Sequence, residues 1–150
     1  MMAAFIKPTL TTKFHIDFDW WQKQARSLRV YLFSHLCAAC AARYADSAPH
    51  PMDWVDPYTG EVRQVDVLWD VIRDCCSHGD DFATPQTPLA VAAFLTFIAN
   101  DNMPLTPVEL HETISVARSP EIILRTLGGR QVYYGIRPVP RSLTRRRRVS

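Results

Sequence analysis

The sequence predicts a mainly α protein, in which a helical N-terminal part packs against a C-terminal part of three short helices and a short β ribbon. Two observations lead to this fold class. Apolar residues recur at helical spacing through most of the chain. Helix-capping residues followed by proline also mark helix starts in the C-terminal part. We therefore expect a helical N-terminal region at residues 1–83, a second domain at 84–139 and a basic disordered tail at 140–150.

Composition places the chain among ordinary globular proteins. Its 150 residues suffice for one domain or two small ones with a modest core. Hydrophobic residues make up 47% and charged residues 21%, which is typical of a soluble protein. No apolar run approaches the roughly 18 residues that span a bilayer, and the first residues do not resemble a signal peptide. The expectation is a cytoplasmic protein without membrane association.

The N-terminal region begins with an extended segment and continues into a long helix. Phe14 and Ile16 alternate with polar residues, which predicts a short strand or a strap across the core. Asp17 or Asp19 is placed to cap a helix over residues 20–44. The apolar stripe of this helix is wide, so we expect the helix to be buried on more than one side.

A loop and a second helix complete the N-terminal region. Residues 46–60 contain three prolines and the turn-forming sequence DPYTG, which predicts a loop. Residues 61–65 suit a short strand. A helix then begins at residue 64 or 66 and ends at Cys76, with a glycine shortly after it.

The first two C-terminal helices have clear start signals. Thr87 is a candidate N-cap, and Pro88 occupies the first helical position of a largely apolar helix that stops at residues 100–102. Thr106 starts the next helix with Pro107 at the first position. Glu109 lies three residues after Thr106, so the two side chains are expected to form a capping box.

A third helix and a strand follow. Ser119 caps a helix that starts at Pro120 and ends before the glycines at 128–129. Residues 130–137 then read as a strand that precedes two prolines. Tyr134 and Gly135 can form the turn of a short hairpin within this strand.

This order of elements resembles a winged helix-turn-helix domain over residues 87–139. The resemblance rests on helix order, caps and spacing, while Pro138 and Pro140 leave room for only a short second strand of the wing. It implies that the helix at 120–127 enters the major groove of DNA, with Arg125 as the candidate for reading a guanine. The implied nucleic-acid-binding residues are Arg118, Ser119, Arg125, Thr126, Arg130, Tyr133, Arg137, Arg145, Arg146, Arg147 and Arg148.

Charge is distributed unevenly along the chain. Residues 103–150 contain nine arginines and three acidic residues, a net charge of +6, whereas residues 1–102 carry a net charge of −4. The basic part coincides with the part that resembles a DNA-binding domain, which favours contact with phosphates. Four consecutive arginines at 145–148 suit a phosphate-binding arm. The alternative interpretation is a solubilising end.

The four cysteines form two pairs, and a cytoplasmic location argues against disulfides. Cys37 and Cys40 are three residues apart, so they share one helix face. The second pair lies near His78, so one structural zinc held by Cys37, Cys40, Cys76 and His78 is one interpretation. Buried free cysteines without any cofactor are the other.

The sequence contains no phosphate loop, dinucleotide fingerprint, nucleophile elbow or HExxH motif, so no catalytic residue is assigned and no enzymatic activity is expected. The preferred hypothesis is a non-enzymatic DNA-binding or nucleoprotein-associated factor. The alternative is an accessory subunit that uses the same surface to contact a protein partner or a second copy of itself. A zinc-stabilised adaptor is a third.

Overall fold

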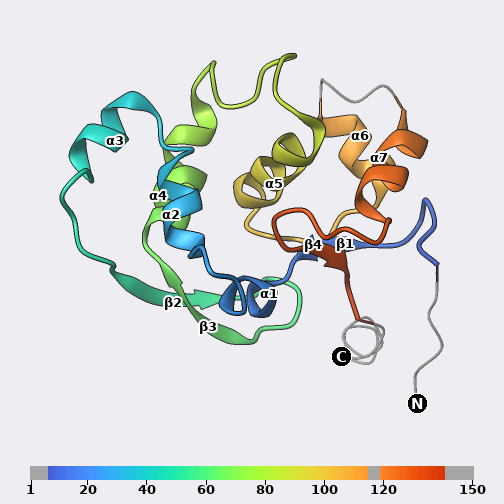
Figure 1. Cartoon of the computed structure of the whole chain (residues 1–150), viewed down its shortest axis with the longest axis horizontal. Coiled ribbons are helices and arrows are strands. Elements are labelled where there is room, and N and C mark those ends of the chain that lie inside the picture. Colours follow the sequence, from blue (N-terminus) through green and yellow to red (C-terminus); the bar gives the residue numbers. More distant parts are fainter. Residues whose placement is uncertain (1–6, 115–118, 141–150) are drawn as a thin grey trace.

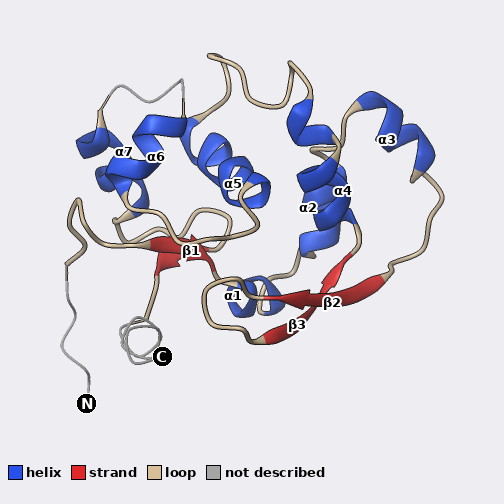
Figure 2. Ribbon diagram, turned by 180° about the vertical axis from the view of Figure 1, so that it is seen from behind, coloured by secondary structure: helices blue, strands red, loops and turns tan. Residues whose placement is uncertain are grey.

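A computed structural model describes residues 7–114 and 119–140 of the chain (Figures 1 and 2). Helices α1 to α7 and two small antiparallel sheets are joined by a 3₁₀ turn and loops. In chain order the elements are β1 (Phe14–Ile16), α1 (Phe18–Gln22), α2 (Leu28–Phe33), α3 (Ala38–Arg43), β2 (Pro51–Val55), β3 (Val62–Asp66), α4 (Leu68–Asp74), η1 (Cys76–His78), α5 (Leu89–Ala99), α6 (Pro107–Thr113), α7 (Pro120–Leu127) and β4 (Ile136–Pro138). None of the described helices has the length and apolar character needed to cross a membrane.

The fold is mixed α/β, so the prediction of a mainly α protein is wrong. Helices account for 41% and strands for 14% of the structure, and β2 and β3 form a hairpin across a segment predicted mostly as loop. The prolines of this segment do not exclude a strand. Pro51 stands at the first position of β2, where its missing N–H group does not interrupt the ladder. The hairpin turn is closed by Asp56, whose carboxylate accepts hydrogen bonds from the backbone of Tyr58 at 2.7 Å and Thr59 at 3.2 Å.

The long helix predicted over residues 20–44 is instead three short helices, α1, α2 and α3. Serine and cysteine residues interrupt it. Ser27 has an extended backbone, and its hydroxyl accepts the N–H of Val30 at 3.1 Å, which starts α2. Cys37 also has an extended backbone and starts α3. Breaking the helix lets α1 and α2 each turn their own apolar side toward the core.

Helix α5 is the centre of the molecule. It lies between the α2–α4 pair on one side and α6 and α7 on the other (Figures 1 and 2). It is buried on most of its surface, and its buried residues are Ala92, Ala93, Phe94, Leu95, Phe97 and Ile98. The same hydrophobic cluster includes residues from both ends of the described chain, from Phe14 to Ile136. The core is therefore continuous across the molecule.

Two consecutive residues that follow α5 link parts of the core through side-chain hydrogen bonds. Asp101 and Asn102 both have positive φ, at 61° and 63°. Asn102 is only 3% exposed, and its amide accepts the N–H of Ile16 at 2.8 Å and donates to the carbonyl of Ile16 at 2.9 Å. The Asp101 carboxylate accepts the ring N–H groups of Trp54 and Trp69 at 2.8 and 3.0 Å.

Helices α6 and α7 start where their signals place them. The capping box of α6 between Thr106 and Glu109 is confirmed, with proline at the first helical position. Ser119 caps α7 by accepting the N–H of Ile122 at 3.2 Å. In α5 the first helical residue is Leu89, and Pro88 is the N-cap in place of the predicted Thr87.

The hairpin after α7 differs from a free wing. Tyr133 and Ile136 pair across a turn in which Tyr134 and Gly135 have φ of 57° and 80°. This turn packs inward, because the Trp21 ring N–H donates to the carbonyl of Tyr134 at 2.9 Å. β4 pairs with β1 from the opposite end of the chain. The ribbon therefore packs against N-terminal residues and does not stand free of the described structure as a wing.

Candidate functional site

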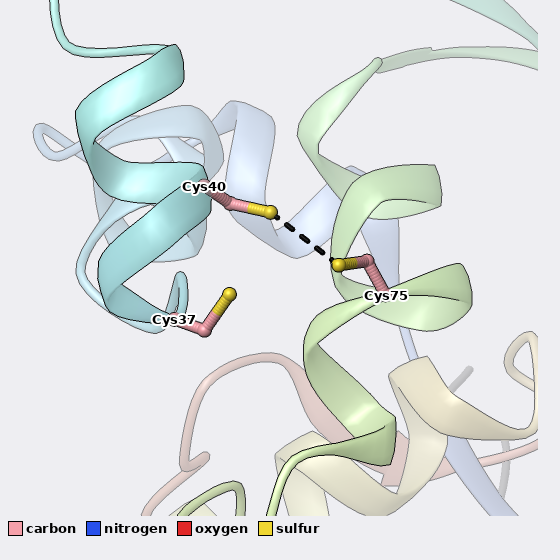
Figure 3. Close-up of side chains that lie close together, drawn as sticks. All are labelled: Cys37, Cys40 and Cys75. Atoms are coloured by element: carbon pink, nitrogen blue, oxygen red, sulfur yellow. Dashed lines mark hydrogen bonds between the residues drawn. The ribbon is translucent and has the colours of Figure 1, made fainter.

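Three cysteine sulfurs lie together between α3 and the end of α4. The Sγ atoms of Cys37, Cys40 and Cys75 are all within 4.8 Å of one another. The Sγ atoms of Cys40 and Cys75 are 3.6 Å apart, and Figure 3 shows these two side chains pointing toward each other from facing elements. We call Cys37, Cys40 and Cys75 the thiol cluster. It can hold a metal ion.

Local structure explains how the cluster is assembled. Cys37 is the N-cap of α3 and Cys40 is its third residue, so both thiols project from one face of the first turn. Cys75 follows the last residue of α4 and has a non-helical backbone, with φ of −121° and ψ of −64°. Cys40 is the one buried residue of α3, which is otherwise alanine and arginine. Contacts between sulfur atoms therefore hold α3 in place, where most helices use an apolar face.

Cys76 lies beside the cluster with a different role. Its side chain is 3% exposed, and its sulfur accepts the backbone N–H of Cys37 at 3.2 Å. The bond fixes the backbone from which Cys37 projects. His78 lies in η1 and is not part of the group of three sulfurs. The structure thus groups Cys75 with Cys37 and Cys40, in place of the predicted Cys76 and His78.

The thiols differ in acidity. The backbone amide of Cys40, in the first turn of α3, and then the neighbouring thiols lower the pKa of Cys37 to about 7. Burial and the adjacent thiols raise the pKa of Cys40 to about 12. Burial also raises the pKa of Cys76. At neutral pH the Cys37 thiol is therefore partly ionised, and a bound cation has to displace the proton of Cys40.

The end of α4 determines which of the two adjacent cysteines joins the cluster. A helix predicted to end at Cys76 keeps Cys75 within its last turn and on its inner side. The helix instead ends at Asp74, and the backbone turns at Cys75. That turn carries the Cys75 sulfur toward α3 and leaves Cys76 packed in the core. One signal in the sequence could have indicated that Cys75 joins the cluster. Cys75 lies within one residue of the predicted helix end, where the backbone can leave the helix.

The residues predicted to contact nucleic acid are only partly brought together. Ser119 is used as the helix cap, while Arg125 and Thr126 lie in the last turns of α7. Arg125 and Arg130 are exposed, and neither takes part in an ion pair with another described residue. Arg118 and the arginines at 145–148 lie outside the described residues.

The remaining two residues predicted to contact nucleic acid interact with other parts of the same chain. Tyr133 is half-buried and pairs with Ile136 in the hairpin. The Arg137 guanidinium lies 3.3 Å from the carboxylate of Asp17 in the N-terminal region. The ion pair directs Arg137 toward Asp17, so Arg137 is less available for a phosphate than Arg125.

A pocket of about 380 Å³ runs along α7. Lys7, from the N-terminal segment, and Arg125 are its basic lining residues, and Glu121 is its acidic one. Pro8 approaches the end of α7 closely, since a Cβ atom on Gly128 would lie 3.4 Å from the Pro8 Cβ. The N-terminal segment therefore covers part of the helix and adds a second positive charge beside Arg125.

Comparison with known proteins does not place the chain in a family. No family model, no curated protein and no solved structure matches it.

Proposed function

We propose that this protein binds one zinc ion through Cys37, Cys40 and Cys75, and that the ion fastens α3 to the end of α4. The observation that carries the proposal is the sulfur spacing. Thiolates at about 2.3 Å from a tetrahedral zinc ion are about 3.8 Å apart, and the Cys40 and Cys75 sulfurs are separated by 3.6 Å. An exchangeable ligand such as water completes the tetrahedron.

The surroundings support a metal site over buried free cysteines. Thiols that only fill space are expected deep in a helix seam, yet Cys75 is exposed and Cys37 is half-buried. The helix that they hold has one buried side chain, Cys40, so packing contributes little to its position. Zinc would also lower the pKa of the thiols, because the cation favours the thiolate.

Adjacent cysteines provide a matched test of the zinc proposal. The protein purified under reducing conditions is expected to contain one zinc per chain by elemental analysis. Cys75→Ser removes a ligand and is expected to weaken zinc binding by more than the roughly 10- to 100-fold that follows loss of an outer-shell contact. Cys76→Ser leaves the ligands intact, and its hydroxyl can still accept the N–H of Cys37, so stoichiometric binding is retained.

The cobalt complex supplies a second readout of the ligand set. Cobalt(II) in place of zinc is expected to give thiolate charge-transfer absorption, which decreases in Cys37→Ser and Cys40→Ser. A protein without metal after reducing purification, and without cobalt absorption on titration, contradicts the proposal. Equal metal loss in the Cys75 and Cys76 variants would also contradict the three-sulfur assignment.

We propose as a second function that the exposed side of α7 binds the phosphate backbone of duplex DNA. The observation that favours it is the basic lining of the pocket beside α7. Lys7 and Arg125 meet there from distant parts of the chain. Arg130, just beyond α7, is exposed as well. Because the hairpin turn is packed against Trp21, this mode relies on the helix and not on a wing.

The dependence of duplex binding on salt tests this second function. Affinity is expected to fall steeply with salt, and Arg125→Ala with Arg130→Ala is expected to reduce the slope of log K against log salt by roughly 2. The control double variant Arg26→Ala with Arg43→Ala removes the same charge from exposed positions elsewhere. Equal effects of the two double variants, or no binding at low salt, contradict the proposal and favour a protein partner for α7.

A further inference from the structure

We propose that Cys40 and Cys75 form a reversible disulfide that links α3 to the end of α4. Their sulfurs are 3.6 Å apart. The disulfide would form within the same cluster as the zinc site. Its formation does not require zinc binding, and only the effect of oxidation on bound metal rests on the proposed function.

The two elements can close the remaining gap at little cost to packing. A disulfide bond is about 2.05 Å long, so the sulfurs must approach by about 1.5 Å. Cys40 is the one buried side chain of α3, so a small shift of this helix disturbs few other contacts. Cys75 follows the end of α4, where the backbone is already non-helical. Figure 3 shows both sulfurs on the facing sides of the two elements.

The structure disfavours a disulfide that uses Cys76, and a disulfide between Cys37 and Cys40 would not join the two elements. Cys75 and Cys76 are adjacent, so their Cα atoms are about 3.8 Å apart, below the usual range of about 4.4–6.8 Å for a disulfide. Cys76 is 3% exposed, and its sulfur already accepts the N–H of Cys37. Cys37 and Cys40 are neighbours on one helical turn, so a bond between them would leave α3 unattached to α4.

Within this pair, exposure decides which thiol reacts first. Cys75 is exposed and Cys40 is buried, so a hydroperoxide reaches Cys75. The Cys75 sulfur attacks the peroxide oxygen, an S–O bond forms as the O–O bond breaks, and the released alkoxide or hydroxide takes up the proton that the Cys75 thiol loses. The Cys40 sulfur then attacks the sulfenic sulfur, the S–S bond forms, and hydroxide leaves with the Cys40 proton as water. Two cysteines are oxidised and one hydroperoxide is reduced.

Oxidation would remove the metal. The disulfide uses two of the three sulfurs of the thiol cluster, so a bound zinc ion keeps Cys37 alone and is expected to dissociate. A thiol reductant would restore both ligands. Bound zinc would in turn protect Cys75 from the oxidant, because the sulfur lone pair is engaged with the ion.

The experiment uses the full chain in its metal-free form. Hydrogen peroxide is added in small excess, and intact mass together with peptide mapping under non-reducing conditions identifies the product. The expected result is a loss of about 2 Da, a peptide linking Cys40 to Cys75, and recovery of the original mass with a thiol reductant. The linked peptide is lost in Cys40→Ser and in Cys75→Ser, and it is retained in Cys37→Ser.

The zinc-loaded chain separates this inference from the proposed function. With a chromogenic chelator present, one zinc is expected to be released for each disulfide formed. If the chain never binds zinc but the linked peptide forms, the metal site is wrong and the disulfide stands. If zinc binds but peroxide gives only sulfinic acid at Cys75, or a disulfide between other cysteines, the inference is overturned.

Discussion

Replacing Gly135 by alanine is expected to lower the free energy of unfolding by about 3 kcal/mol, combining a positive-φ penalty with overpacking. Gly135 has φ of 80° and is buried in the hairpin turn. A Cβ atom there would lie 2.9 Å from the Trp21 ring nitrogen and 3.3 Å from the carbonyl of Asp17. The Trp21 ring would have to move, which also weakens its hydrogen bond to the Tyr134 carbonyl.

Gly60 is the matched control for this variant. It has the same φ of 80°, but a Cβ atom added to Gly60 would meet nothing within 4 Å. Gly60→Ala therefore carries the backbone penalty alone, about 1 kcal/mol. Urea unfolding followed by circular dichroism compares the two variants. Equal losses at the two glycines would show that the hairpin turn is not packed against Trp21.

Asn102→Ala is expected to be the second large loss, about 4 kcal/mol, because it leaves two buried backbone groups without partners. The Asn102 amide bonds both the N–H and the carbonyl of Ile16. Alanine also tolerates the φ of 63° less well than asparagine does. A loss of this size is a large share of the stability of an ordinary domain, which is about 5–15 kcal/mol.

Asn100 supplies the comparison for Asn102. It is also an asparagine after α5, but its φ is −98° and its side-chain N–H group makes one bond, to the carbonyl of Met103 at 3.1 Å. Asn100→Ala is expected to cost about 1 kcal/mol. Thermal and urea unfolding of both variants test the ranking. A larger loss at Asn100 than at Asn102 would contradict the role assigned to the Asn102 amide.

The helices of the C-terminal part could be predicted because their signals are local. The capping box of α6 joins Thr106 to Glu109, and the cap of α7 joins Ser119 to Ile122, each over three residues. The partner of β4 could not be predicted in this way. Ile136 pairs with Ile16 across most of the chain, and such pairing depends on the packed core and not on neighbouring residues.

The thiol cluster could be predicted only in part, because only one of its pairs depends on residues that are close in the sequence. Cys37 and Cys40 are brought together by one turn of α3, so their spacing indicated a pair. The choice between Cys75 and Cys76 depends on the residue at which α4 ends, and helix ends are the least certain feature of a sequence pattern. Because the backbone turns at Cys75, Cys75 joins the cluster and Cys76 packs in the core.

The small buried surface of α3 has a consequence for how stability is distributed. Trp69, Phe94 and Leu32 are fully buried, so the large residues around α4, α5 and α2 open only when the whole chain unfolds. α3 buries one side chain, Cys40. Its opening is therefore a separate local equilibrium with its own free energy, and a ligand that binds the sulfurs raises that free energy. Amide hydrogen exchange within residues 38–43 would report the state of the cysteines while the rest of the protein remains protected.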